Sequence, residues 1–128
     1  MAFVFANPNP HGIRVGDCVV RALSIALNQS WEKTYADLAL QGFVSADMPS
    51  SNNVWGEYLR WKGFRRYILP DTCPACYTVR EFAEDHRRGV YVVATGTHAV
   101  AVIDGDYFDA WDSGDEVTDY YFTKEKNG

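Results

Sequence analysis

The chain has little of what would assign it to several large classes of protein. Its 128 residues include only three cysteines and three histidines. An odd and low number of cysteines argues against a full disulfide framework. The apolar content of 47% is typical of a globular protein and too high for a disordered one. No stretch approaches the ~20 apolar residues that a membrane-spanning helix needs, so we expect no membrane partner.

Positive charge is also scarce. Lysine and arginine number 12 against 17 aspartates and glutamates, which gives a net charge of −5. Proteins that bind nucleic acid need clustered cations to contact phosphates, so we expect no nucleic-acid partner. The one basic cluster, at Lys62–Arg66, is interpreted as a solvated helix end. The chain also lacks a phosphate-binding glycine loop and a dinucleotide fingerprint, and we expect no cofactor.

The first seven residues have no basic region and too short an apolar run for a signal peptide. Together with the low cysteine count, this predicts a reducing, cytoplasmic environment. A phage protein made in a bacterial cytoplasm would have the same features.

Two of the three cysteines form a Cys-Pro-Ala-Cys motif at Cys73 and Cys76. Such a motif is typical of a redox pair, or of half a zinc site with His86 as a distant third ligand. A structural zinc site needs four ligands, and the sequence offers no fourth. A thioredoxin-like pair would need a surrounding βαβ pattern, which is missing. The preferred interpretation is a turn with two ordinary thiols, and no metal is expected.

The order of the predicted elements indicates an α+β fold in a single domain spanning residues 1–128. Caps and apolar spacing predict helices after Asp17, Ser30 and Asn52, and a capping box predicts a fourth after Thr78. A short strand is predicted at 67–69, before Pro70. After Gly89 the period changes, and tight turns at 95–97 and 104–106 predict an antiparallel sheet with strands at 90–95, 98–103, 107–112 and 117–122. The helical half covers about 17–63 and the sheet half about 64–123.

The remaining cysteine, Cys18, stands directly after a helix cap, and His98 opens a predicted strand. A helix N-terminus stabilises a thiolate through its dipole and its free N–H groups. A nearby imidazole can take the proton from the thiol, and a carboxylate can hold the imidazole in the correct tautomer. Cys18 and His98 therefore predict a nucleophilic cysteine site.

Two carboxylates can serve as the third group, and the length of one hairpin turn decides between them. A three-residue turn at 104–106 would set His98 opposite Asp112, whereas a two-residue turn would make Asp109 its diagonal neighbour on the same face. Asp112 is favoured because it stands at the strand end, where the chain opens toward a cleft. Asp109 is the alternate.

These residues carry a resemblance to a known family. Asp17-Cys18 at the start of an apolar helix, followed by His98-Ala99-Val100-Ala101-Val102 and then Trp111-Asp112-Ser113, resembles the papain-like cysteine peptidase superfamily. The chain is most similar to small bacteriocin-processing peptidase domains and to papain-like proteins of phage and bacterial genomes, over about residues 13–113. The resemblance implies a papain-like fold, with Cys18 as nucleophile, His98 as general base and then acid, and Asp112 as orienting residue.

One family feature is missing. The family usually has a glutamine a few residues before the cysteine, and its side chain donates to the oxyanion. Residues 11–16 contain no glutamine. The backbone N–H of Cys18 offers one donor, and Asn9, His11 and Arg14 are the side-chain candidates for another.

The sequence thus predicts a cysteine peptidase or amide hydrolase with a peptide or protein substrate. Two alternatives stay open. One is a cell-wall amidase or endopeptidase of CHAP-like type, which has the same order of cysteine and histidine. The other is a non-catalytic papain-like binding or regulatory protein of phage origin, which the missing glutamine favours.

Overall fold

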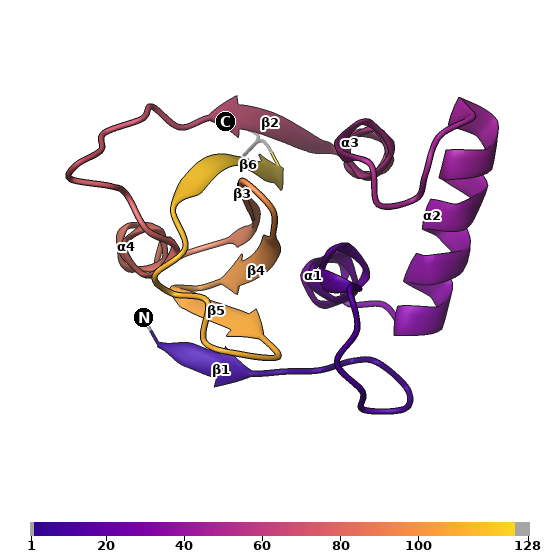
Figure 1. Ribbon diagram of the computed structural model, residues 1–128, viewed down its shortest axis with the longest axis horizontal. Helices are drawn as coiled ribbons and strands as arrows, with labels where there is room; N and C mark the ends of the chain where they lie inside the picture. Colours follow the sequence, from indigo (N-terminus) through magenta and orange to yellow (C-terminus); the bar gives the residue numbers. More distant parts are fainter. Residues whose placement is uncertain (1, 125–128) are drawn as a thin grey trace.

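A six-stranded sheet forms the centre of the molecule, as the computed structural model, which describes residues 2–124, shows (Figure 1). The strand order is β1-β5-β4-β3-β6-β2. Neighbouring strands are antiparallel, except that β1 runs parallel to β5. The strands are β1 (Phe3–Phe5), β2 (Phe64–Ile68), β3 (Val90–Thr95), β4 (Ala99–Ile103), β5 (Asp106–Asp109) and β6 (Thr118–Lys124).

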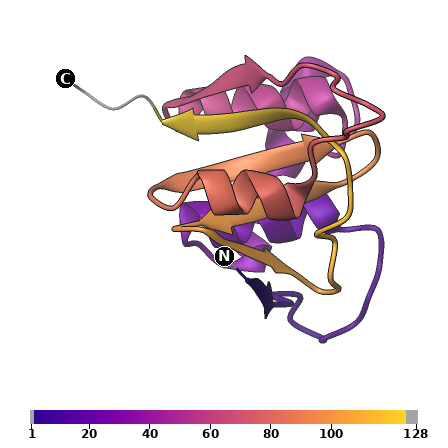
Figure 2. The same ribbon diagram turned by 90° about the vertical axis from the view of Figure 1, so that its left-hand side faces the viewer.

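Helices cover both faces of this sheet. Helices α1 and α3 lie on one face with α2 outside them, and α4 lies on the opposite face (Figures 1 and 2). The central strands are apolar on both faces for this reason. Val92 and Ala94 belong to the cluster under α1 and α3, whereas Val93 packs on the side of α4. The helices are α1 (Cys18–Leu27), α2 (Trp31–Ser45), α3 (Asn52–Trp61) and α4 (Val79–Asp85).

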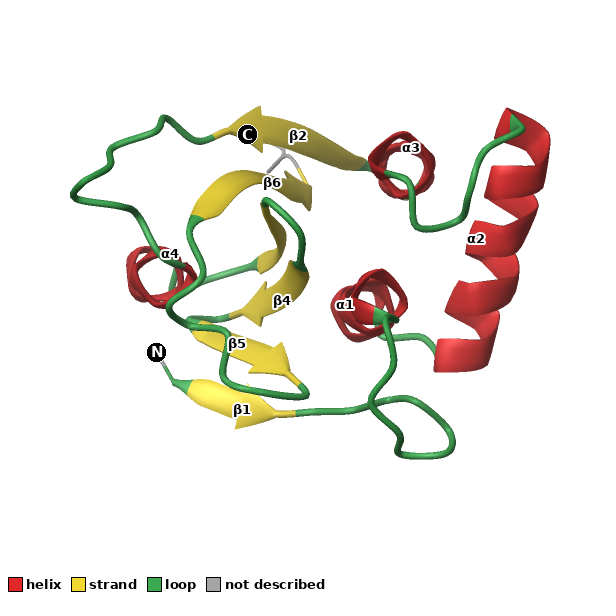
Figure 3. Cartoon of the chain, viewed as in Figure 1, coloured by secondary structure: helices red, strands yellow, loops and turns green. Residues whose placement is uncertain are grey.

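The α+β class is confirmed, but the predicted separation of a helical half from a sheet half is wrong in one respect. Strand β1 precedes the helices in sequence and pairs with β5, more than 100 residues later, as in Phe3 opposite Tyr107. The loop from β1, green in Figure 3, then leads to the start of α1. Three residues are too few to show a period of two, so local pattern gave no sign of this strand.

The predicted helix starts are confirmed where a side chain forms the cap. The hydroxyl of Ser30 accepts a hydrogen bond from the backbone N–H of Lys33 at 3.0 Å. Thr78 and Glu81 form the reciprocal bonds of a capping box. Tyr77 packs edge-on against Phe82, with ring centroids 6.3 Å apart, as a hydrophobic staple requires. These contacts fix the entry of the chain into α2 and α4.

The core beneath α1 fixes the place of the helix that carries Cys18. Leu23 has no exposed surface and belongs to the same cluster as Trp55 and Phe122. The indole of Trp55 packs against two rings of β6, 6.1 Å from Tyr120 and 5.3 Å from Phe122. Helix α1 is therefore held between β4 on one side and α2 on the other.

Within residues 2–124, no helix has both the length and the apolar character needed to span a membrane.

Replacing Leu23 by alanine tests this core. We expect Leu23→Ala to lower the free energy of unfolding by about 2–5 kcal/mol, because it removes a fully buried side chain from a packed site. Leu40→Ala on α2 is the matched control. That side chain is 64% exposed, and its loss is expected to change stability by less than about 0.5 kcal/mol. Equal effects in urea denaturation would contradict the described packing.

Candidate functional site

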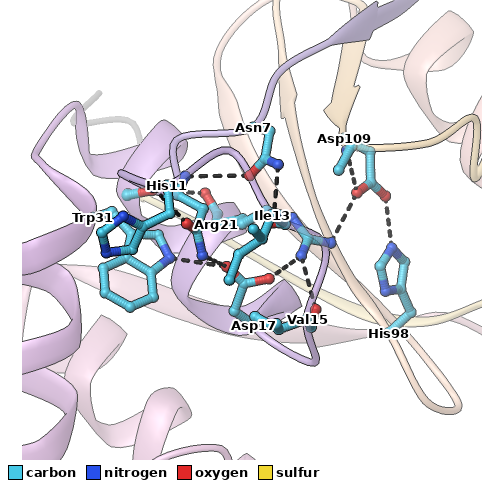
Figure 4. A network of polar contacts seen from close by, with 12 residues as sticks. Asn7, His11, Ile13, Val15, Asp17, Arg21, Trp31, His98 and Asp109 are labelled. Carbon is cyan, nitrogen blue, oxygen red and sulfur yellow. Dashed lines mark hydrogen bonds and ion pairs between the residues drawn. The ribbon is translucent and has the colours of Figure 1, made fainter.

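The hairpin between β4 and β5 decides which carboxylate meets His98. Ile103 pairs with Asp106, so the turn consists of two residues, Asp104 and Gly105. Both have positive φ, 50° and 87°, as a type I′ turn requires. In this register Asp109 is the diagonal neighbour of His98. The two side chains meet directly, with Nε2 of His98 2.6 Å from Oδ2 of Asp109 (Figure 4).

The expectation that Asp112 orients His98 is therefore wrong, and Asp109 takes that place. The chain leaves the sheet after Asp109, so Asp112 does not face His98 across a strand pair. Its side chain is 52% exposed. It accepts hydrogen bonds from the hydroxyl of Tyr107 at 2.6 Å and from the N–H of Gly114 at 3.0 Å. Asp112 thus stabilises the loop that follows β5.

Asp109 lies in a buried site rich in donors. Its Oδ2 accepts a hydrogen bond from the hydroxyl of Ser113 at 2.6 Å. Its Oδ1 accepts from the N–H of Ala110 at 2.7 Å and from Nη2 of Arg21 at 3.2 Å. Burial would raise the pKa of this carboxyl, but the hydrogen bonds from His98 and Ser113 outweigh it and lower the pKa below the ordinary value. Asp109 is therefore ionised at neutral pH.

Cys18 and His98 line one cavity of about 310 Å³. Cys18 is the first residue of α1 and is half-buried, while the side chain of His98 is 9% exposed. The ring of Trp111 packs against His98, with centroids 4.9 Å apart. The cavity is lined by Gly16, Cys18, Val19, Ser50, Asn52, Trp55, Ala94, Thr95, Gly96, Thr97, His98 and Ala99.

The pKa of Cys18 is lowered and the pKa of His98 is raised. Burial would raise the pKa of the Cys18 thiol. Hydrogen bonds from the His98 ring and the Ala99 backbone, with the positive charges of His98 and Arg21, outweigh it and lower that pKa. Burial would lower the pKa of His98, but hydrogen bonds with Asp109 and Cys18 raise it to about 9. Since Nε2 is bonded to Asp109, Nδ1 is the ring nitrogen left for the sulfur. The pair favours a thiolate next to an imidazolium.

The first backbone N–H groups of α1 are not capped by the side chain of the N-cap residue, because that side chain binds other partners. Asp17 occupies the N-cap position, but its side chain makes no capping hydrogen bond. Its carboxylate instead accepts hydrogen bonds from Arg21, from the indole of Trp31 at 2.9 Å and from the side chain of Asn9 at 3.3 Å. The prediction that Asp17 is the N-cap residue is right, but its side chain does not accept a hydrogen bond from the helix N–H groups. The N–H groups beside Cys18 remain available to an anion.

The three side chains expected near an oxyanion are not on the cavity wall. Asn9 is buried, and its Oδ1 accepts a hydrogen bond from the backbone N–H of His11 at 2.9 Å. His11 and Arg14 are exposed on the same loop. The polar side chains on the wall are instead those of Ser50, Asn52, Thr95 and Thr97.

No sequence pattern pointed to the wall residues at 50 and 52, because the loop that carries them reaches the site only through tertiary packing. Asn52 has a defined orientation, since its Oδ1 accepts a hydrogen bond from the indole N–H of Trp55 at 3.1 Å. Its amino group has no hydrogen-bond partner among residues 2–124. That amino group is a possible donor to a bound ligand.

The interpretation of Cys73 and Cys76 as ordinary thiols is wrong, because the two sulfurs form a disulfide. Neither lines the cavity with Cys18. His86 is not a metal ligand with them: its ring stacks on Phe82 at 3.7 Å, and its Nδ1 lies 2.7 Å from the Phe82 carbonyl. In the part of the chain that the structure describes, no three histidine, cysteine, aspartate or glutamate side chains are grouped so that they could hold a metal ion.

Removing the partner of His98 should change its titration. We expect Asp109→Asn to lower the pKa of His98 below its value of about 9, because burial still disfavours the cation and the carboxylate, one of the two partners that raise this pKa, is gone. Asp112→Asn is the matched control and should leave that pKa unchanged. Imidazole proton shifts followed by NMR measure both. A pKa near 9 in Asp109→Asn would contradict the assignment.

The same contact makes stability depend on pH. The pKa of His98 is higher in the folded chain, about 9, than its ordinary value of 6.5. Its contribution to stability is therefore complete below pH 6.5 and is lost as the pH rises through about 9. The lowered pKa of Cys18 acts on stability in the opposite sense, so the test is a difference: between about pH 6.5 and 9 the wild type should lose stability relative to Asp109→Asn. Identical pH dependence in the two proteins would argue against the contact.

The sulfur chemistry predicts one reactive thiol. Unreduced native protein should react with a chromogenic thiol reagent at Cys18 alone, and the reduced, unfolded chain should react at all three cysteines. Three reactive thiols in the unreduced native protein would contradict the disulfide.

A thiol from the start of α1 and an imidazole from the turn before β4 thus lie on the wall of one cavity, and a buried carboxylate from the end of β5 bonds the imidazole from behind that wall. Comparisons of the chain with protein-family models, curated proteins and solved structures find no match.

Proposed function

We propose that the chain is a cysteine peptidase or amide hydrolase. Cys18 is the nucleophile, His98 carries the proton and Asp109 orients the imidazole. The observation that supports this most is the bonding of His98. One ring nitrogen is fixed by an ionised, buried carboxylate, and the ring interacts with a half-buried thiol in a shared cavity. A lone buried cysteine would need neither of these partners.

The reaction would proceed in two balanced stages. The Cys18 thiolate adds to the substrate carbonyl carbon, and the carbonyl π pair moves to oxygen, near the open backbone N–H groups of α1. The tetrahedral species collapses as His98 donates its proton to the leaving amine, so the C–N bond breaks and a thioester remains. His98 then takes a proton from water, and the hydroxide attacks the thioester. The Cys18 sulfur leaves as thiolate and His98 is again protonated.

The finer proposal is that the fold is papain-like. Two features support it: the nucleophile begins a helix packed against the sheet, and the histidine directly precedes β4 while its carboxylate ends the adjacent antiparallel strand β5. The orienting carboxylate is Asp109 in place of Asp112 in this proposal. In this proposal, backbone N–H groups at the start of α1 take the role of the family's glutamine as hydrogen-bond donors to the oxyanion.

A second candidate function has its own support. A non-catalytic papain-like binding protein is favoured by the absence of Asn9, His11 and Arg14 from the cavity wall. Loss of one oxyanion donor typically lowers a rate by ~10²–10³. Such a loss would leave the cavity able to bind a peptide and slow to cleave it.

Alkylation and turnover test the hydrolase directly. At about pH 6, where an ordinary thiol is mostly protonated, Cys18 should still react with iodoacetamide because its pKa is lowered. Wild type should release nitrophenol from p-nitrophenyl acetate and cleave members of a peptide mixture scored by mass spectrometry. Cys18→Ala should lose both activities by at least about 10³-fold. Clearing of a peptidoglycan gel by the wild type would assign the substrate to the cell wall.

The control is the double variant Cys73→Ser/Cys76→Ser, which removes the other two sulfurs and should retain the activity of Cys18. Turnover that survives in Cys18→Ala would refute the hydrolase. Peptide binding that is equal in wild type and Cys18→Ala, without turnover in either, would favour the binding protein instead.

A further inference from the structure

We propose that Arg21 is a positioning residue of the Cys18 site, holding the helix that bears the thiol and the carboxylate that bears the imidazole in a fixed relation. The inference deepens the proposed function and rests on it for the roles of Cys18 and His98. Arg21 lies one turn along α1 from Cys18. It is 5% exposed, far more buried than arginine usually is.

A single guanidinium connects two elements of the site (Figure 4). Its Nη1 forms an ion pair with Asp17, the residue before Cys18. Its Nη2 forms another with Oδ1 of Asp109 at 3.2 Å. The same nitrogen that binds Asp17 also lies 3.5 Å from the carbonyl of Val15. The start of α1 and the end of β5 therefore share one planar cation.

The bridge buries three charged groups, so each of them needs its partner. The side chains of Asp17 and Asp109 are 7% and 3% exposed, so two carboxylates are buried with Arg21 between them. A buried charge that loses its partner is strongly destabilising. The guanidinium presents its donors in a rigid plane, whereas an ammonium is a point charge. Arginine can thus span both carboxylates at once, and lysine at the same position can engage only one.

The bridge acts on the site through Asp109. Arg21 binds Oδ1 of that carboxylate together with the N–H of Ala110, and this helps to fix the rotation of the carboxylate in which Oδ2 points at His98. The charge of Arg21 also helps to lower the pKa of Cys18. On its other side, Arg21 engages the Asp17 side chain, which makes no capping hydrogen bond at the start of α1.

The charged and titratable groups that face Arg21 are thus Asp17 from the loop before α1 and Asp109 from β5, with Cys18 and His98 beyond them. This set predicts an effect on the pH dependence of Cys18, which a purely structural residue would not have.

The experiment compares Arg21→Met and Arg21→Lys with wild type by measuring the rate of Cys18 alkylation by iodoacetamide as a function of pH. In Arg21→Met the midpoint should move to higher pH, and the rate at about pH 6 should fall by about tenfold or more, since one pKa unit is tenfold in thiolate. Arg21→Lys should restore part of the loss, because it keeps the charge but not the bridge. Circular dichroism confirms folding.

Arg80→Met is the matched control. Arg80 also pairs with two aspartates, Asp112 and Asp115, but its side chain is 40% exposed and lies away from the cavity. This variant should alkylate as wild type does. An Arg21→Met protein that is folded and has the wild-type pH profile would overturn the proposal. If Arg21→Met does not fold, Arg21→Lys decides: a shifted profile supports the proposal and a wild-type profile overturns it.

These outcomes are separate from those of the hydrolase test, because alkylation requires no turnover. A shifted profile in a protein without hydrolytic activity would leave Arg21 as the positioning residue of a thiolate site and remove the hydrolase. Hydrolysis and alkylation that are both unchanged in folded Arg21→Met would keep the hydrolase and remove the role of Arg21.

Discussion

The buried carboxylate of Asp109 is the interaction on which the rest of the site depends. A carboxylate that is 3% exposed is costly to bury unless its oxygens are satisfied. Here Oδ1 accepts from Arg21 and from the backbone after β5, while Oδ2 accepts from His98 and Ser113. These donors come from α1, from the turn before β4 and from the loop after β5. One charge therefore sets the mutual arrangement of three segments.

Around this charge the side chains are buried on one side and line an open cavity on the other. His98 and Asp109 are covered, and Trp111 packs on the imidazole, so the electrostatic attraction between them is little screened by water. Cys18 is half-buried at the cavity wall, where a ligand can reach it. As a consequence the pKa of His98 rises to about 9 and the pKa of Cys18 falls below its ordinary value. Sheet and helix packing make this possible, because α1 is held against β4.

The elements that sequence analysis predicted well are those with a local cause. Ser30 and Thr78 cap helices with their own side chains, and short apolar runs bounded by turn residues mark β3 and β4. The choice of carboxylate failed for an instructive reason. Asp104-Gly105 is a strong signal for a two-residue turn, and adding one residue to that turn moves every later side chain of the hairpin by one position. A three-residue turn sets Asp112 opposite His98, whereas the observed two-residue turn brings Asp109 into contact with His98.

The α+β class, the positions of the capped helices and the candidate chemistry of a thiol with His98 could all be predicted from local sequence, because propensity, capping and spacing act over a few residues. Long-range packing was needed to show that β1 joins β5, that Arg21 bridges Asp17 and Asp109, and that residues 50 and 52 line the cavity. These contacts join residues far apart in the chain. Their energy comes from burial and charge compensation, which exist only once the sheet and α1 have packed together.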